Sequence, residues 1–132
     1  MSDNIRHQAV HADNLPKPAG PYSPGTTLDG LIFVSGQGAN DPRTGEIVGH
    51  DIESQTEQVL RNVDAILRAA GSDLAHVLRC NVYLVDIAEF SRMNAVYSRI
   101  FGSNRPARTT VQVSALPGPG LRVEIDAIAY KK

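Results

Sequence analysis

Two stretches near the end of the chain alternate between apolar and polar residues, and this pattern restricts the fold more than any other. Residues 106–114 read Pro-Ala-Arg-Thr-Thr-Val-Gln-Val-Ser, and residues 121–130 read Leu-Arg-Val-Glu-Ile-Asp-Ala-Ile-Ala-Tyr. A period of two is typical of a β-strand that buries one face. Because the segment between them, residues 116–120, is Leu-Pro-Gly-Pro-Gly, we predict two adjacent strands joined by a sharp loop.

The alternation assigns the side chains of this predicted pair to two faces. The face expected against the core carries Ala107, Thr109, Val111 and Val113 with Leu121, Val123, Ile125, Ala127 and Ala129. The opposite face carries Arg108, Thr110 and Gln112 beside Arg122, Glu124 and Asp126. An arginine that faces carboxylates in this way is either a surface salt bridge or a fixed binding site for an anion. The pattern alone leaves both interpretations open.

The rest of the chain adds two helices and further strands. From Ile52 to Ala70 the apolar residues recur at helical spacing, with Asp51 placed to cap the helix and Gly71 to end it. A second helix begins in the capping box Asp86-Ile-Ala-Glu89 and ends at Gly102. Strands are predicted at residues 31–36, 46–49 and 77–87. This order predicts an α+β fold in which both helices cover one face of a single sheet.

The second face of the predicted sheet has no helix to cover it. It carries a mixture of charged, uncharged polar and aromatic side chains, namely Arg79, Asn81, Tyr83, Arg108, Thr110, Gln112, Glu124 and Asp126. From this mixture we predict that another copy of the chain covers this face, with the polar groups of a site at the seam. The alternative is a monomer whose second face is in water, as antiparallel sheets commonly tolerate.

Length and charge exclude several classes of function. With 132 residues, the chain is long enough for one domain and too short for two, so we expect residues 1–132 to form a single domain. A net charge of −1 provides no general field that would attract nucleic acid or anionic lipid. The start of the chain lacks the pattern of a signal peptide, and no apolar run approaches membrane-spanning length. We therefore expect a cytoplasmic protein with neither a nucleic acid nor a membrane as partner.

The sequence predicts neither a metal site nor a nucleotide cofactor. Gly36-Gln-Gly38 lacks the third glycine of a dinucleotide-binding fingerprint. His7 and His11 are four residues apart, but their segment has no helical pattern and no acidic third ligand. The single cysteine, Cys80, fits a reducing compartment and is expected to pack inertly in the core.

Arg108 is the strongest candidate for a binding residue. Pro106 favours an extended backbone before the arginine, and the β-branched Thr109 and Thr110 keep it extended afterwards. The guanidinium is therefore carried by rigid structure, and its planar fork matches a carboxylate.

Five motifs in the right order make the chain resemble the RidA (YjgF) family of imine and enamine deaminases. They are Gly20-Pro-Tyr-Ser-Pro24, Val34-Ser-Gly-Gln37, Met93-Asn-Ala-Val-Tyr97, Pro106-Ala-Arg-Thr109 and Val123-Glu-Ile-Asp-Ala-Ile-Ala129. The resemblance implies a chorismate-mutase-like α+β protomer with a mixed, mostly antiparallel sheet and two helices on one face. It also implies a homotrimer with ligand clefts between neighbouring subunits.

The resemblance implies hydrolysis of reactive enamine or imine acids, such as 2-aminoacrylate, to 2-oxoacids and ammonia. Pyridoxal-phosphate enzymes release such intermediates, and no metal or cofactor of the family's own is implied. By position, Arg108 would bind the substrate carboxylate and Asp126 would orient the water. The other implied site residues are Tyr22, Ser35, Gly36, Asn94 and Thr110. The chain differs from the family pattern at two positions. The family carries a glutamate where we align Asp126, and many members carry a cysteine where this chain has Thr110.

Three alternatives to this function stay open. The segments 116–120 and 127–131 are also similar to family members that deaminate aminomuconate. A second alternative is a protein that binds a small carboxylate at Arg108 without turnover, because the shorter Asp126 misplaces the water. The family has also been labelled as ribonuclease or translation inhibitor, which the net charge of −1 and the lack of a basic stripe disfavour.

Overall fold

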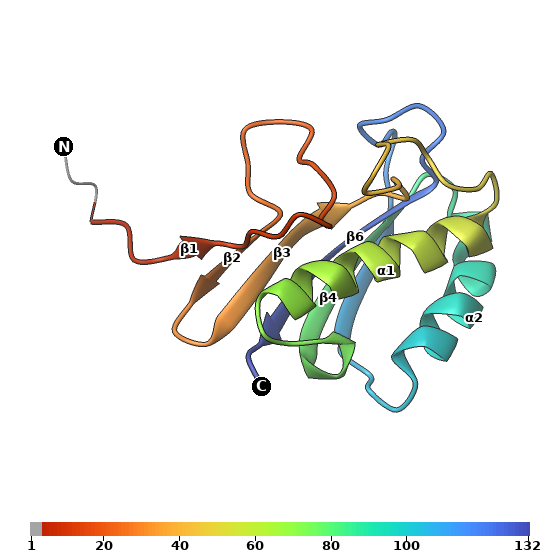
Figure 1. The fold of residues 1–132 in the computed structure, drawn as a ribbon. Coiled ribbons are helices and arrows are strands. Elements are labelled where there is room, and N and C mark those ends of the chain that lie inside the picture. Colours follow the sequence, from red (N-terminus) through yellow and green to blue (C-terminus); the bar gives the residue numbers. More distant parts are fainter. Residues whose placement is uncertain (1–3) are drawn as a thin grey trace.

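A computed structural model describes residues 4–132 of the chain (Figure 1). Six strands form one sheet in the order β1-β2-β3-β6-β4-β5, and two α-helices lie across one face of it. Neighbouring strands are antiparallel except for β4 and β5, which are parallel. The strands are β1 Gln8–Ala9, β2 Gly25–Leu28, β3 Leu31–Gln37, β4 Val77–Leu84, β5 Ala107–Gln112 and β6 Val123–Tyr130, and the helices are α1 Ile52–Ala69 and α2 Phe90–Phe101. The predicted α+β fold with a mixed sheet and two helices is confirmed.

Local signals in the sequence explain where α1 begins and where α2 ends, whereas the predicted capping box at Asp86–Glu89 forms a separate turn because the Glu89 side chain binds Arg122. The Asp51 carboxylate accepts a hydrogen bond from the Ser54 backbone N–H at 2.7 Å, which caps α1. Asp86 caps a short 3₁₀ turn at Ile87–Glu89, and α2 follows directly. Gly102 ends α2 with a φ of 63°, a conformation that favours glycine.

The core lies between the sheet and the two helices. Side chains from α1, α2, β3, β4 and β6 are completely buried there, among them Ile32, Val59, Leu60, Val63, Ile66, Leu67, Cys80, Val82, Leu84, Met93, Val123 and Ile125. Burying each large aliphatic side chain contributes roughly 1.5–3 kcal/mol relative to leaving it in water. No helix among residues 4–132 is both long enough and apolar enough to cross a bilayer.

Two buried amide side chains of α1 hold the loops at one end of the sheet. Gln55 donates to the Gly120 carbonyl at 2.9 Å and accepts from the Arg122 backbone N–H at 2.7 Å. Asn62 donates to the Asn40 carbonyl at 2.8 Å. These bonds fasten the segments 38–51 and 116–122 to a rigid helix. They therefore fix part of the wall of the pocket between the loops 16–24 and 36–45, which is described below.

The prediction that residues 106–114 and 121–130 form adjacent strands is wrong. β4 lies between them, paired in parallel with β5 on one side and antiparallel with β6 on the other. The connection, residues 113–122, is long enough to cross the end of β4, whereas a link of about two to five residues would have required the two strands to pair. Residues 46–49 form no strand either, and only Ile47 makes an isolated bridge to Asn40.

The predicted faces of β5 are also reversed. Arg108 pairs with Cys80, which is completely buried on the helix side, and Thr110 pairs with buried Val82. The side chains expected in the core, Ala107, Thr109 and Val111, are exposed instead. β5 is the edge strand of the sheet, and there the more apolar face need not be the buried one.

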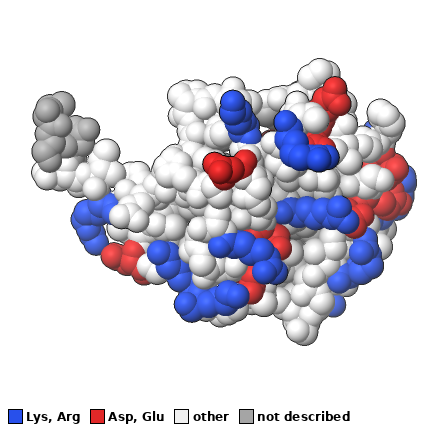
Figure 2. Space-filling view, in the orientation of Figure 1, with Lys and Arg blue, Asp and Glu red and all other residues white. Residues whose placement is uncertain are grey.

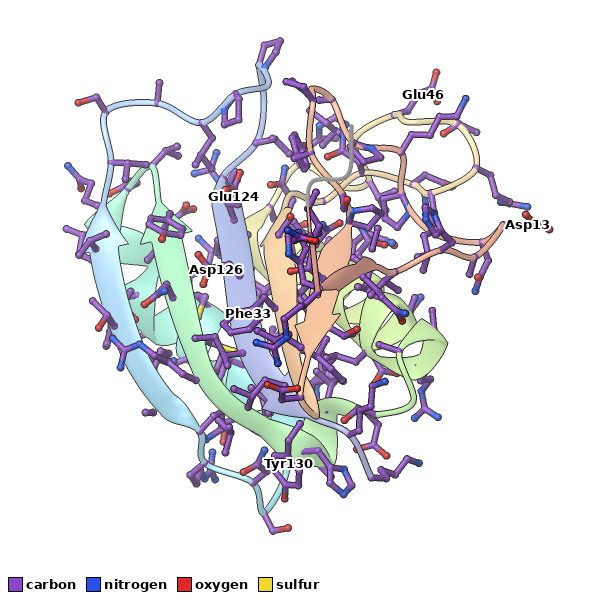
Figure 3. All side chains as sticks on the ribbon, turned by 90° about the vertical axis from the view of Figure 1, so that its left-hand side faces the viewer. Asp13, Phe33, Glu46, Glu124, Asp126 and Tyr130 are labelled. Atoms are coloured by element: carbon purple, nitrogen blue, oxygen red, sulfur yellow. The ribbon has the colours of Figure 1, made fainter. Side chains whose placement is uncertain are left out.

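The face of the sheet away from the helices keeps the rest of its predicted residues. Arg79, Asn81, Tyr83, Glu124 and Asp126 belong to this open face, and Figure 3 shows Glu124, Asp126 and Phe33 on it. Arg108, Thr110 and Gln112, predicted to lie beside them, belong to the helix side. Because Arg108 and the carboxylates of β6 lie on opposite faces, the salt bridge considered from the sequence does not form.

Candidate functional site

The predicted site residues fall into two separate places on the chain. One is a pocket of about 290 Å³ lined by Asn94, Tyr97, Ser98, Arg105, Pro106 and Arg108, here called the Arg108 pocket. The other is a pocket of about 310 Å³ between the loops 16–24 and 36–45, lined among others by Tyr22 and Gly36 and called the Tyr22 pocket.

The Arg108 guanidinium lies against two aromatic rings of α2. Its central carbon is 4.7 Å from the centroid of the Tyr97 ring and 5.6 Å from that of Phe90. Such cation–π contacts hold the flat group in place without neutralising its charge. In the described part of the chain, no carboxylate forms an ion pair with Arg108. Its positive charge is therefore available to an anion that enters the pocket.

Three buried polar atoms around Arg108 have no hydrogen-bond partner within residues 4–132. Asn94 Oδ1 and the Tyr97 hydroxyl belong to residues that line the pocket, whereas Thr110 Oγ1 lies two residues after Arg108 on the same face of β5 and outside the lining. Leaving a buried donor or acceptor unsatisfied costs about 1–3 kcal/mol. Burial raises the pKa of the Tyr97 hydroxyl, so it stays neutral and can donate a hydrogen bond at neutral pH. The pocket thus combines a cation with polar groups that a ligand could satisfy.

Cys80 lies behind this pocket and behaves as the sequence predicts. It is completely buried, and desolvation raises the pKa of its thiol to about 11. The thiol therefore stays protonated at neutral pH, and the reactive thiolate does not form to any useful extent.

Tyr22, Ser35 and Gly36 lie together at the second place. The Ser35 hydroxyl donates to the Ser23 carbonyl at 2.7 Å, and the Ser35 backbone N–H donates to the Pro24 carbonyl at 2.9 Å. These two bonds fasten the proline-rich loop against β3. The Tyr22 hydroxyl accepts from the Ala19 backbone N–H at 3.1 Å, while the residue is half exposed. Ser35 therefore fixes the position of the loop, whereas the Tyr22 side chain lines the pocket itself.

Glu124 is a candidate that the sequence analysis did not single out. It lies so close to Gly36 that a Cβ atom at position 36 would overlap the Glu124 carboxylate. Within the described residues, Glu124 forms no hydrogen bond and no ion pair through its side chain. Burial, with the negative charge of Asp126 as the smaller cause, raises the pKa of Glu124. A raised pKa makes a carboxylate a better proton acceptor, and the same group can return the proton afterwards.

Asp126 is bound by its neighbours instead. Its Oδ1 accepts from the Asn81 amide at 2.9 Å and its Oδ2 accepts from the Tyr83 hydroxyl at 3.0 Å. Both oxygens are therefore engaged, and the open face presents Glu124 rather than Asp126 beside Gly36. The register of β3 against β6, irregular between Val34 and Gln37, produces this arrangement, and no local sequence signal could have predicted it.

The two places cannot serve one small molecule within a single copy of the chain. Arg108 belongs to the helix side of edge strand β5, whereas Glu124 belongs to the open side of β6, with β4 between them. Asn94 lines the Arg108 pocket, and Thr110 lies on the same face of β5 as Arg108. Tyr22 lines the other pocket together with Gly36, which lies against Glu124. Among residues 4–132, no group of three or more His, Cys, Asp or Glu side chains is arranged to hold a metal ion.

Known proteins with similar sequences and folds cover almost the whole chain. The model of the family described as endoribonuclease L-PSP matches residues 12–131. A RutC family protein from Pyrococcus horikoshii is 49% identical over 125 residues, which cover 95% of this chain and 98% of that protein. The human 2-iminobutanoate/2-iminopropanoate deaminase is 40% identical over 131 residues, covering 99% of this chain and 94% of the human protein. The crystal structure of E. coli TdcF with bound serine is 34% identical, with a TM-score of 0.88 and coverage of 95% of this chain and 99% of that one.

Proposed function

Because the chain belongs to the endoribonuclease L-PSP family, which is the family of the RidA (YjgF) proteins, we propose that it hydrolyses 2-imino or enamine acids to 2-oxoacids and ammonia. The observation that carries this proposal is Arg108, which has no carboxylate ion-pair partner within residues 4–132 and lines one pocket with Asn94 and Tyr97, each of which has a buried polar atom that is unsatisfied in that range. The name of the human relative specifies two small 2-imino acids, and the E. coli TdcF structure contains serine. All of these molecules carry a carboxylate next to a carbon that bears nitrogen.

The substrate carboxylate binds Arg108. A planar guanidinium donates two parallel hydrogen bonds to a carboxylate, and such charge-assisted bonds are about twice as strong as neutral ones. The Tyr97 hydroxyl, kept neutral by burial, donates a further bond. With the carboxylate held, the imine carbon has a fixed position relative to the pocket wall, which lowers the entropic cost of water attack.

A second copy of the chain supplies the other half of the site. Arg108 and Asn94 of one copy face Tyr22, Gly36 and Glu124 of a neighbour, because the sheet separates these groups within one copy. This division supports the homotrimer with clefts between subunits that the family resemblance implies. Exposed apolar side chains on the sheet, including Leu31, Phe33, Leu78 and Val111, give such an assembly an apolar contact surface.

Glu124 orients the water and moves its proton. A protonated imine is already electrophilic, so water adds to C2 while Glu124 accepts a proton, which gives a neutral carbinolamine. Glu124 then returns that proton to the amino group, the C–N bond breaks with its electron pair on nitrogen, and the hydroxyl becomes the 2-oxo group. The hydroxyl proton leaves with ammonia as ammonium. The raised pKa of Glu124 suits both transfers, whereas Asp126 has both oxygens occupied.

A coupled assay with a serine or threonine dehydratase tests the activity. The dehydratase is a pyridoxal-phosphate enzyme that releases an unstable enamine acid, and this protein should speed 2-oxoacid formation above the spontaneous rate. Arg108→Ala should leave folding intact and lower kcat/KM by about 10²-fold. This loss corresponds to two factors of ten, at about 1.4 kcal/mol for each, for the lost bonds to the substrate carboxylate. Arg61→Ala, which removes an exposed arginine of α1 paired with Glu57, is the matched control. Binding of small 2-oxoacids without any rate effect would favour the non-catalytic carboxylate-binding alternative.

Mixed oligomers test whether two copies share the cleft. Arg108→Ala and Glu124→Gln each disable a different half, so a random mixture of the two chains restores both halves in roughly a quarter of the clefts of a ring. Co-refolded mixtures should therefore be clearly more active than either variant refolded alone. A mixture no more active than the average of its components would place the whole site within one copy.

A substrate panel separates the remaining alternatives. Aminomuconate-type enamines test the aromatic-degradation alternative directly, as larger substrates for the same site. The ribonuclease alternative has little electrostatic support, because basic and acidic side chains lie intermixed over the face in Figure 2 and the net charge is −1. Salt-sensitive binding of RNA at physiological ionic strength would reverse that judgement.

A further inference from the structure

The Arg108 pocket contains a second arginine that the proposed reaction does not use. Arg105 lies in the connection between α2 and β5 and lines the same pocket. Its Nη1 donates to the Ser98 hydroxyl at 3.0 Å, and Ser98 is also part of the pocket wall. In the described part of the chain, no carboxylate forms an ion pair with Arg105.

The charge of the pocket wall is therefore unbalanced. Its six lining residues include two guanidinium groups and no acidic side chain. Four other arginines on or next to helices have acidic partners, since Arg61 pairs with Glu57, Arg68 with Asp64, Arg92 with Glu53 and Arg122 with Glu89. Exposed Arg99 of α2 has no such partner among the described residues. A single substrate carboxylate on Arg108 would leave Arg105 without an anionic partner.

The local backbone keeps the two arginines at a limited separation. They are three residues apart, so their Cα atoms are at most roughly 10–11 Å from each other along an extended chain. Pro106 fixes part of that path. Because both side chains line one pocket of about 290 Å³, a small acid with two anionic ends can meet both.

We propose that the Arg108 pocket selects 2-imino dicarboxylates, with Arg108 on the carboxylate next to the imine carbon and Arg105 on the distal carboxylate. This inference rests on the proposed deaminase function and names its substrate class. The imines of four- and five-carbon amino diacids are the small acids of this class, because each carries a second carboxylate at the other end of its carbon chain. Ser98 acts as a positioning residue, because its hydrogen bond orients the Arg105 guanidinium toward the pocket.

Paired substrates test the inference. An aspartate or glutamate oxidase generates the 2-imino diacid in the assay, and an alanine-accepting amino acid oxidase generates 2-iminopropanoate as the monocarboxylate. The protein should show a higher kcat/KM for the diacid. Arg105→Ala should lower kcat/KM for the diacid about tenfold and leave that for 2-iminopropanoate within about twofold, and Arg105→Lys should recover part of the loss.

Arg99→Ala is the matched control, because Arg99 is exposed on α2 and does not line the pocket. It should leave the ratio between the two substrates unchanged. An equal loss on both substrates in Arg105→Ala, or no loss on either, would overturn the inference. A lower oligomeric state in this variant with unchanged selectivity would also overturn it, since Arg105 would then serve the contact between copies.

A binding measurement tests the second anion site independently of the proposed deaminase activity. Titration calorimetry with 2-oxoglutarate and pyruvate measures the same selectivity without turnover. If the wild-type protein hydrolyses neither imine but prefers 2-oxoglutarate, and Arg105→Ala removes that preference, the second anion site stands and the deaminase proposal fails. If turnover occurs with no preference for the diacid in either experiment, the deaminase proposal stands and the second site fails.

Discussion

Replacing Glu124 by glutamine distinguishes the two carboxylates on the open face of the sheet. Glutamine has nearly the same shape, so it can occupy the space against Gly36, but it cannot accept a proton from water. General acid–base catalysis by one side chain contributes about 10²–10⁴-fold to the rate. We expect kcat to fall by that factor in Glu124→Gln. Stability should stay the same or rise, because the repulsion between Glu124 and Asp126 disappears.

Replacing Asp126 by alanine should give the opposite pattern. It leaves the Asn81 amide and the Tyr83 hydroxyl without their acceptor. Hydrogen bonds to a charged group contribute roughly 1.5–3 kcal/mol each, and water can reach these half-buried donors, so we expect a net loss of about 2 kcal/mol. For a domain of this size that corresponds to a decrease in Tm of about 6–10 °C. The effect on kcat should be much smaller than that of Glu124→Gln.

The pH dependence of the rate adds an independent signature. Glu124 must be ionised to accept a proton, so kcat/KM should decrease as the pH falls through its raised pKa. The negative charge of Asp126 contributes to that raised pKa. In Asp126→Ala the acidic limb of the profile should therefore move to lower pH.

Single-turnover rates with the dehydratase-generated enamine, together with thermal unfolding of each variant, measure both effects. Arg61→Ala again serves as the control for an exposed charge. If Glu124→Gln kept most of the wild-type kcat while Asp126→Asn lost it, Glu124 would have no part in the chemistry. Asp126 would then hold the role that the sequence analysis assigned to it.

Three further variants give simpler outcomes. Gly36→Ala places a methyl group on the Glu124 carboxylate, so it should lower kcat at least tenfold, and an unchanged rate in the same assay would contradict the contact. Tyr97→Phe removes a buried hydroxyl without a partner in the described residues, so it should raise the free energy of unfolding by up to about 1 kcal/mol in urea titrations while increasing KM. Hydrogen bonds from His76 and Lys132 lower the pKa of Asp73 to about 2, so stability should decline as the pH falls from about 4 toward 2. Asp73→Asn should flatten that decline, and an unaltered acid-unfolding curve would refute the role of the carboxylate.

Local signals made the helices predictable. Asp51, the apolar stripe that follows it and the glycine after the helix each act within a few residues, and α1 forms where they indicate. The pattern of apolar residues is also a local property, and it predicted β3, β4, β5 and β6, but it gave no sign of the short strands β1 and β2 and suggested a strand at residues 46–49 that does not form. The order of strands in the sheet depends on contacts between distant segments, and the long link 113–122 gave no reason to insert β4 between β5 and β6.

The same difference between local and distant contacts explains what was found and missed at the site. The family motifs brought Tyr22, Ser35, Gly36 and Asn94 to attention for one cleft, and within one copy of the chain the first three lie near one another while Asn94 lies in the Arg108 pocket. Glu124 was missed because its significance depends on the register of β6 against β3, which brings it against Gly36. The side of the sheet on which Arg108 lies was missed because an edge strand carries few constraints on its faces.

The distribution of unsatisfied groups connects the stability of the chain with its proposed chemistry. Within residues 4–132, buried polar atoms of Asn94, Tyr97 and Thr110 have no hydrogen-bond partner, and the open face carries a half-buried carboxylate beside another one. Each arrangement destabilises the isolated chain, since an unpartnered buried group costs about 1–3 kcal/mol. A ligand carboxylate would offset the first cost, and a water bound by Glu124 would offset the second. Because the two arrangements lie on opposite faces of one sheet, a single small ligand can satisfy both only where two copies of the chain meet.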